Sequence, residues 1–464
     1  MFRHVAFYSK KGGRAAGMAA SQVDLTTGNV RSAILRFSAP IFFSQLFQQL
    51  YNSVDSLIVG NYLGKQSLAA VSSSGSLILL LVGFFSGIAV GAGVVISRYF
   101  GAQEREKMLL AIHTSVAFGL CAGAFLTVFG VVMTPSILRW MGTAPDVIDD
   151  SILYFRVYFY GAVPLVMYNV FTGIMRALGD SRRPLYYLIF SSLLNVVLDL
   201  LFVAKLHMGV EAAAAATAIA QGASMLLCIY ALTRKDAEVR VEWRKIGFDR
   251  DVLREIVRNG IPAGVQNSVI SVANVLVQTN INSFGSDAMA ACGSFAKLDG
   301  FCFLPVTSFS MALTTVISQN LGAKRYDRAK ETARFGIATC LIMAEVIGLT
   351  IARFAPHLIR LFNDDPDVVA IGVLQCRTQL PFFFLLSFSH CIAGICRGAG
   401  KSKVPMLVML STWCVFRILY IEAAMRLRHE IRLLFFAYPI TWALSSAIFL
   451  VYYLKSDWIH GFDR

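Results

Sequence analysis

Long stretches without a charged residue recur along this chain, and they limit its possible folds more than any other feature. Residues 66–97 contain no Asp, Glu, Lys or Arg, and neither do residues 108–138. A helix crosses the hydrocarbon core of a bilayer with about 20 mostly apolar residues, so both stretches are long enough to span it. Only 15% of all residues are charged and 56% are hydrophobic, which excludes a soluble domain. We therefore predict an all-α membrane protein.

Segments of this kind follow one another along the whole chain, and twelve of them can be placed. They cover residues 33–63, 67–97, 109–133, 151–175, 184–206, 210–233, 252–283, 288–320, 331–353, 370–396, 404–425 and 431–454. A basic tail, residues 1–30, precedes them and lacks the apolar core and cleavage site of a signal peptide. We expect an N-terminal lobe over residues 31–233, a charged inter-lobe loop over 234–250 and a C-terminal lobe over 251–464.

Basic residues gather at alternate ends of the predicted helices. About 30 of the 42 Lys and Arg residues lie in the two tails and in every second loop. Cytoplasmic loops of membrane proteins carry such an excess, so we place both termini and the inter-lobe loop in the cytoplasm and the protein in the plasma (inner) membrane. The same pattern explains the net charge of +14. We therefore expect the lipid bilayer as a partner and no nucleic acid.

The first half of the sequence returns in the second half at an offset of about 221 residues. Each unit holds six spans, an even number, so both units enter the membrane from the same side and the repeat is parallel. We predict two six-helix bundles, related by a pseudo-twofold axis along the membrane normal, that face each other across a cleft. A duplicated channel or structural protein would show the same repeat. Matched pairs include Ile96 and Ile317, Gly101 and Gly322, Arg176 and Arg397, Gly179 and Gly400, and Pro184 and Pro405.

Cysteine and histidine patterns give no support for an enzyme or a metal centre. The nine cysteines lie in apolar segments without a C-x-x-C pair, and the seven histidines form no H-E-x-x-H motif. Zinc sites and redox sites need such clustered ligands. We expect no catalytic residue, no cofactor and no protein-bound metal other than a transported ion.

Two carboxylates lie inside predicted spans, where a charged group is costly and indicates function. Asp55 follows Arg36 by roughly 28 Å of helix, and Asp199 follows Arg183 by roughly 24 Å, at 1.5 Å per residue. Because both helices run in the same direction, both carboxylates reach a similar depth. Three further polar side chains are expected near that level: Asn195, Thr217 and Tyr154.

These five residues are the predicted ion-coupling site. Asp55, Asn195, Asp199 and Thr217 could bind Na⁺ through oxygen atoms, and the two carboxylates could equally share protons. The alternative is that each side chain bonds separately to a helix backbone. The second bundle has Leu276 or Val277, Phe416 and Tyr420 at the repeat-related positions of Asp55, Asn195 and Asp199. We therefore expect the ion site in the N-terminal lobe only.

Several of these residues form motifs that resemble a known family. Gln48 with Tyr51-Asn52-x-x-Asp55, Leu68-Ala69-Ala70-Val71, Arg176-x-x-Gly179-Asp180 and Leu194-Asn195-x-x-Leu198-Asp199 resemble spans of the multidrug and toxic compound extrusion (MATE) family. The resemblance extends over residues 24–455. Together the motifs resemble those of the family's DinF-type prokaryotic branch. It implies a twelve-helix, two-lobe antiporter with Asp55 as the coupling carboxylate and Asn195, Asp199, Tyr154 and Thr217 as its partners. The long basic N-terminus departs from the family pattern.

Uncharged polar residues on the first and seventh spans predict a surface for substrates. We expect Gln48, Tyr51, Asn52, Gln266 and Asn267 to line it, together with Asn169 of the fourth span. Aromatic, Met and amide groups suit the promiscuous binding of flat cations, although such residues more often join neighbouring helices. Pro40 weakens the first span near its start, where the helix could bend.

On these grounds we predict secondary antiport by alternating access. Cationic or amphipathic small molecules would leave in exchange for H⁺ or Na⁺, and we expect the transporter to be a monomer. A flippase for a lipid-linked or polysaccharide precursor is the alternative, but the spans hold few of the basic residues that would bind phosphates. A channel and a membrane-embedded enzyme are two further classes. Passive ion conductance by the purified protein would identify a channel. A membrane-embedded enzyme would need a nucleophile–base pair, and the sequence does not show one.

Overall fold

The computed structural model describes residues 23–462 except 141–142, 144, 146 and 235–238. Helices make up almost all of this part, and no strand occurs in it. In chain order they are α2 (Val30–Tyr62), α3 (Gly64–Gly101), α4 (Arg105–Trp140), α5 (Ile148–Tyr160), α6 (Ala162–Ala177), α7 (Arg182–Asp199), η1 (Leu200–Lys205), α8 (Glu211–Thr233), η2 (Trp243–Lys245), α9 (Arg250–Asn282), α10 (Ser286–Gly322), α11 (Tyr326–Arg360), α12 (Pro366–Gln379), η3 (Leu380–Phe382), α13 (Phe383–Gly398), α14 (Lys403–Met409), η4 (Leu410–Phe416), α15 (Arg417–Leu427) and α16 (Ile431–Lys455).

The prediction of an all-α protein with twelve spans is confirmed. Ten helices of the described chain are long and apolar enough to cross a membrane, and the bent pair α5 and α6 makes an eleventh. The twelfth is α2, which has 33 residues and carries polar side chains along its second half. Each predicted segment coincides with one helix or with one interrupted helix, as in α12–η3–α13 and α14–η4–α15.

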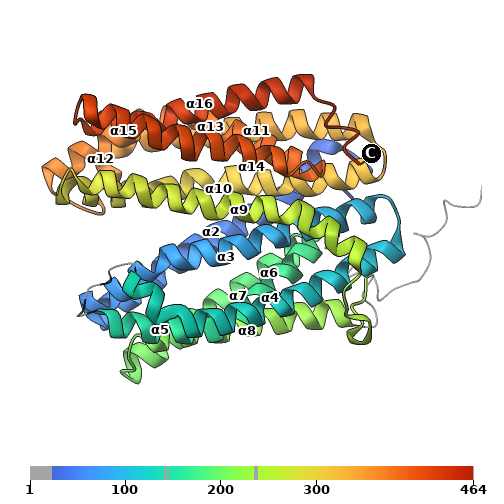
Figure 1. Cartoon of the computed structure of the whole chain (residues 1–464), viewed down its shortest axis with the longest axis horizontal. Helices are drawn as coiled ribbons and strands as arrows, with labels where there is room; N and C mark the ends of the chain where they lie inside the picture. Colours follow the sequence, from blue (N-terminus) through green and yellow to red (C-terminus); the bar gives the residue numbers. More distant parts are fainter. Residues whose placement is uncertain (1–22, 141–142, 144, 146, 235–238, 463–464) are drawn as a thin grey trace, which may run out of the picture.

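The helices form two lobes, with α2–α8 in the lower half of Figure 1 and α9–α16 in the upper half. Each lobe has a buried core of its own. Phe155, Phe159 and Phe171 lie in the N-terminal core, whereas Phe383 and Phe449 lie in the C-terminal core. In its first half α2 also packs on the other lobe, because Phe37 and Ile41 contact Ala312 and Val316 of α10.

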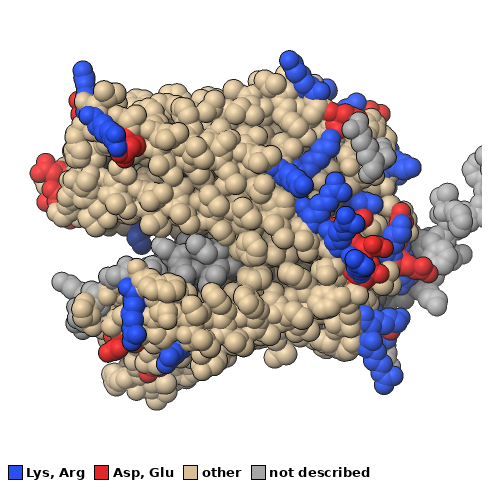
Figure 2. Space-filling view, viewed as in Figure 1, with Lys and Arg blue, Asp and Glu red and all other residues tan. Residues whose placement is uncertain are grey.

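The two ends of the bundle differ in charge, and we name them accordingly. The basic end carries both described terminal segments, and Lys and Arg gather there in Figure 2. The opposite end carries the turns after α2, α4, α9 and α11. In Figure 2 the surface is hollowed between the lobes at the opposite end and continuous toward the basic end.

Close helix contacts shut the seam between the lobes in its basic half. A Cβ built on Gly260 of α9 would lie 2.7 Å from the Cα of Ile88 in α3, so only glycine permits this crossing. Ser318 of α10 donates a hydrogen bond to the carbonyl of Val94 in α3 (2.8 Å). Gln319 donates to the carbonyl of Ala177 in α6 (2.7 Å). The lobes therefore form a V that is closed at the basic end.

Candidate functional site

The two predicted carboxylates meet inside the N-terminal lobe. Asp55 of α2 and Asp199 of α7 lie within hydrogen-bond distance of each other, so the pair can share one proton. Asp199 has no exposed surface, and Asp55 is half-buried. The depth that helix rise predicts for the two residues therefore matches their placement in the structure.

An amide and a hydroxyl complete the polar contacts of the pair. The amide of Asn195 satisfies both of its ends when Nδ2 donates to Asp199 Oδ2 (2.8 Å) and Oδ1 accepts from the backbone N–H of Thr217 (3.2 Å). The Thr217 hydroxyl donates to the carbonyl of Ala213 (3.0 Å). Asn195 therefore links α7 to α8 and points its N–H groups at the carboxylate. We call the set Asp55, Asn195, Asp199, Thr217 and Tyr154 the carboxylate cluster.

Two carboxylate oxygens of this cluster lack a partner. Oδ1 of Asp55 and Oδ1 of Asp199 are shielded from solvent and accept no hydrogen bond within the described part of the chain. Buried polar atoms of proteins are otherwise almost always paired. A proton on the pair, or a cation with oxygen ligands, would satisfy them. The geometry therefore suits a site that exchanges a small positive ion.

Tyrosines surround the pair. Tyr154 is buried and lies close enough to Asp55 and Asp199 to interact electrostatically with both. Tyr51, which we predict to line the substrate surface, also lies close to Thr217 and Asp55 of the cluster. Tyr158 was missed by sequence reasoning, although it follows Tyr154 by one helical turn and its ring stacks on that of Tyr154 at 6.3 Å. That i, i+4 spacing was the available signal.

Irregular helices position these side chains. The π-helix η1 begins at the residue after Asp199, and single π turns are rare and often found at functional sites. The α5–α6 pair bends by 47° at Gly161. A Cβ on Gly161 would lie 2.6 Å from the Cβ of Ala218, beside Thr217. The bend therefore brings Tyr154 and Tyr158 of α5 against α8.

An apolar layer separates the cluster from the opposite end. One turn beyond Asp55, Val59 packs on Tyr154, Val210, Ala213 and Ala214. Ile58 likewise packs on Val203 of η1 and on Ala212 at the start of α8. An ion that enters from the hollow must pass this layer or the exposed face of α2.

The predicted substrate residues divide into two groups. Asn52 is exposed, Gln48 is half-buried, and Asn169 is half-buried with its amide donating to the carbonyl of Leu165 (2.9 Å). Asn267 is exposed and donates across the seam to the carbonyl of Gly83 (3.1 Å). Of these four residues, Asn267 has a contact that joins the two lobes.

Gln266 does not lie on that surface. Its side chain is buried and donates to the sulfur of Met409 in α14 (2.6 Å). Polar positions outside the core of α9 instead follow the face of Asn267, where the half-buried Ser271 and the exposed Asn274 and Gln278 recur at helical spacing. The sequence prediction named both Gln266 and Asn267, and only Asn267 lies on the exposed face of the helix.

Two other acids of the predicted spans, Glu345 and Glu422, lie in the C-terminal lobe, away from the cluster. Glu345 of α11 accepts a hydrogen bond from the backbone N–H of Phe384 (3.0 Å), and so caps the start of α13. Glu422 is exposed and forms an ion pair with Arg426 (2.7 Å). Arg417 is buried and bonds to Thr441 (3.0 Å) in the C-terminal lobe. The repeat-related region of that lobe thus holds a buried cation.

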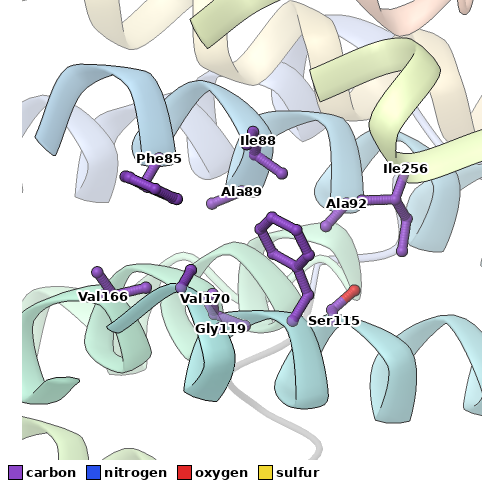
Figure 3. Close-up of a pocket in the computed structure, with 11 residues that line it drawn as sticks. Phe85, Ile88, Ala89, Ala92, Ser115, Gly119, Val166, Val170 and Ile256 are labelled. Carbon is purple, nitrogen blue, oxygen red and sulfur yellow. The ribbon is translucent and has the colours of Figure 1, made fainter. Parts of the chain in front are cut away.

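A small apolar pocket lies elsewhere in the N-terminal lobe (Figure 3). It is closed on one side by Ile256 of α9, which belongs to the other lobe. No charged side chain lines it, so it offers no ion site. Its lining comprises Phe85, Ile88, Ala89, Ala92, Ser115, Phe118, Gly119, Ala122, Val166, Val170 and Ile256. Among the described residues, no three His, Cys, Asp or Glu side chains are grouped closely enough to hold a metal ion.

Comparisons with known proteins agree with this architecture. The family profile described as MatE matches residues 40–201 and 262–421, one match in each lobe. The chain is 29% identical to "Probable multidrug resistance protein YoeA" of Bacillus subtilis (strain 168), over 90% of this chain and 92% of that protein.

Solved structures show the same fold. A MOP superfamily transporter from Pyrococcus furiosus superposes with a TM-score of 0.88 at 24% identity, over 96% of this chain and 98% of that chain. A crystal structure of MATE in complex with MaL6 superposes with a TM-score of 0.88 at 25% identity, over 94% and 98% of the respective chains.

Proposed function

Because this chain belongs to the MATE family of multidrug efflux transporters, we propose that it exports cationic or amphipathic small molecules in exchange for H⁺ or Na⁺. The observation that carries this proposal is the buried Asp55–Asp199 pair, whose two unpartnered oxygens can accept a small cation. A drug transporter without ion coupling would have no use for such a costly group inside the membrane.

The cluster can couple the ion to the drug through α2. This helix carries Asp55 in one lobe, while its first half packs on Ala312 and Val316 of the other lobe. Neutralising the pair changes how the second half of α2 packs against α7, because two carboxylates without a shared ion repel each other. Pro40 lies within α2, and a proline weakens helix hydrogen bonding at its position. Ion binding can therefore alter α2 and displace a compound held beside Gln48 and Asn52.

Alternating access follows from the two lobes. The described conformation is hollowed at the opposite end and closed at the basic end, and rocking of parallel repeats exchanges such states. We infer that the basic end faces the cytoplasm of the inner membrane, since cytoplasmic loops carry the excess of Lys and Arg. The described state would then face outward. One chain supplies both lobes, so a monomer suffices.

A flippase for lipid-linked precursors is not favoured. The central surface described here carries amide side chains such as Asn52 and Asn267, whereas a diphosphate headgroup would call for cations that donate to its oxygens. The relative YoeA is named for multidrug resistance, which agrees with export of small molecules.

Transport into proteoliposomes tests the proposal. Purified protein would be given ethidium while a pH gradient and a Na⁺ gradient are imposed separately. We expect concentrative uptake with one gradient, and loss of that uptake when an ionophore dissipates it. Equal uptake with and without any gradient would contradict coupled antiport.

A further inference from the structure

We propose that both terminal segments act as straps that hold the seam closed at the basic end. The N-terminal strap comprises residues 23–29 and the C-terminal strap residues 456–462. Each strap contacts both lobes, so each must release one lobe when the lobes part at that end. This inference rests on the proposed alternating access and adds a control element to it.

The N-terminal strap is attached to the N-terminal lobe at the α6–α7 turn. The backbone N–H of Val23 donates to the carbonyl of Gly179 (3.1 Å). Gly179 has a φ of 86°, and a Cβ at this position would lie 2.8 Å from the Val23 carbonyl oxygen. Glycine is thus needed both for the turn and for the close approach of the strap.

The same strap is anchored in the C-terminal lobe by an apolar side chain. Leu25 is only 1% exposed and packs in one cluster with Ala312 and Val316 of α10. Asn320, also in α10, donates to the carbonyl of Leu25 (3.1 Å). Removing this apolar side chain from water favours the docked strap.

Two arginines at the start of α11 bind the strap's backbone. Arg328 donates to the carbonyls of Leu25 (3.2 Å), Thr27 (2.5 Å) and Gly28 (2.6 Å), which uses the forked geometry of its guanidinium. Arg325 donates to the carbonyl of Thr26 (2.5 Å). Four successive carbonyls are thereby held by the C-terminal lobe.

Asp24 sets the shape that presents these carbonyls. Its carboxylate accepts from the backbone N–H groups of Thr26 (2.9 Å) and Thr27 (3.0 Å) and from the hydroxyls of both threonines. Partial burial raises the pKa of Asp24, but the hydrogen bonds from Thr27 and Thr26 outweigh it and leave that pKa below its ordinary value. The ionised form therefore favours the turn that presents these carbonyls to Arg325 and Arg328.

The C-terminal strap repeats this arrangement in the other lobe. Gly400 follows Gly179 by 221 residues and again has a positive φ, of 73°. The ring of Phe462 lies against Gly400 and also faces the guanidinium of Arg98 in α3 at 4.9 Å. Lys401 donates to the carbonyl of Asp457. The strap thus joins the C-terminal lobe to the N-terminal lobe.

Pseudo-symmetry makes a chance contact a poor explanation. In each lobe the same glycine turn receives a terminal segment, and that segment continues to a basic residue or basic pair of the other lobe. Opening of the basic end would separate Gly179 from Arg328 and Gly400 from Arg98. The straps therefore oppose opening, and their release sets how easily the inward state forms.

A distance measurement on the full chain in lipid nanodiscs tests the straps. Spin labels would be placed on exposed residues of the two lobes, Glu106→Cys and Glu331→Cys, with the exposed native cysteine removed by Cys121→Ser. The ratio of long to short distances then reports how often the basic end opens. Arg328→Ala removes three hydrogen bonds from a charged group. The control is Lys330→Ala, which removes the same charge from an exposed side chain of the same helix.

We expect Arg328→Ala to raise that ratio about tenfold, equivalent to about 1.4 kcal/mol, and Lys330→Ala to change it less than about twofold. Phe462→Ala, which removes the ring from Arg98, should raise it about two- to fivefold. Equal ratios for Arg328→Ala and Lys330→Ala would overturn the proposal. A lower thermal stability of Arg328→Ala without any gain in long distances would also overturn it, because the strap would then be merely structural.

The same labels separate this inference from the proposed function. If long distances never appear in the wild type, even with drug and an imposed pH or Na⁺ gradient, alternating access itself is wrong. If they appear and the strap variants leave them unchanged, only the strap inference is wrong.

Discussion

Gly260 is the position where one added methyl group should part the lobes. It lies where α9 crosses α3, and a Cβ there would be 2.7 Å from the Cα and 3.0 Å from the carbonyl oxygen of Ile88. Backbone atoms cannot move aside as the end of a flexible side chain can. Gly260→Ala must therefore widen the seam or shift one of the two helices.

The expected size of this effect follows from overpacking. Extra methyl groups in a well-packed interior cost about 1–3 kcal/mol. Alanine also favours the helix by up to about 1 kcal/mol over glycine, but α9 is helical in both the closed and the open state, so this gain cancels between them. The clash exists only while the lobes touch. We therefore expect the equilibrium to move toward the state open at the basic end by about 5- to 150-fold.

Alkylation of a buried cysteine measures this shift. Ser318→Cys places a thiol at a fully buried position of the seam, in a Cys121→Ser background, and its reaction rate in nanodiscs rises with the open fraction. Gly222→Ala is the matched control, because a Cβ there meets no atom within 4 Å. Equal alkylation rates in the Gly260→Ala and Gly222→Ala proteins would refute the reasoning that this crossing holds the basic end shut.

Three further predictions concern the site, the orientation and the N-terminal strap. Asp199→Asn should abolish gradient-driven export while folded protein remains in the membrane, whereas Tyr420→Phe, at the repeat-related position, should be mild; equal losses would count against an ion site in one lobe only. A cysteine introduced at Lys245 should be labelled from the cytoplasm and one at Asp149 from outside, and labelling from the reverse sides would overturn the orientation. Despite partial burial, hydrogen bonds from Thr27 and Thr26 hold the pKa of Asp24 below its ordinary value, so the turn that presents the strap's carbonyls is stabilised at neutral pH and loses this stabilisation as the pH falls through the lowered pKa. The open fraction, measured with the spin labels, should therefore rise at acidic pH in the wild type, and Asp24→Asn should abolish that dependence; an unchanged pH profile in the variant would assign it to other groups.

The spans and the carboxylate cluster could be predicted because they depend on local, regular rules. Hydropathy locates the membrane helices, and a constant rise per residue places Asp55 and Asp199 at one depth. The same estimate of depth along the helices predicted that Asn195 and Thr217 lie near the two carboxylates. The long α2 was predicted from its run of mostly apolar residues, despite its amide side chains.

Other features depend on contacts between distant segments, which the sequence does not encode locally. Glycines allow one face of α9 to approach α3 closely. On the same helix Gln266 is buried, whereas the adjacent Asn267 is bonded across the seam to Gly83. The bend at Gly161 brings Tyr158 into the site. The strap around Leu25 was assigned to a plain basic tail, because its bonds are to residues about 300 positions away.

The coupling role of Asp55 is the central claim, and the transport behaviour of Asp55→Asn tests it most directly. This change keeps the size and polarity of the side chain and removes its charge, so it should resemble a permanently neutralised site. Proteoliposomes would be assayed for ethidium exchange without a gradient and for accumulation driven by a pH or Na⁺ gradient, with Asp55→Glu as the variant that keeps the charge. We predict that Asp55→Asn retains exchange and loses accumulation, while Asp55→Glu keeps part of both. Accumulation by Asp55→Asn at the wild-type rate would contradict the account.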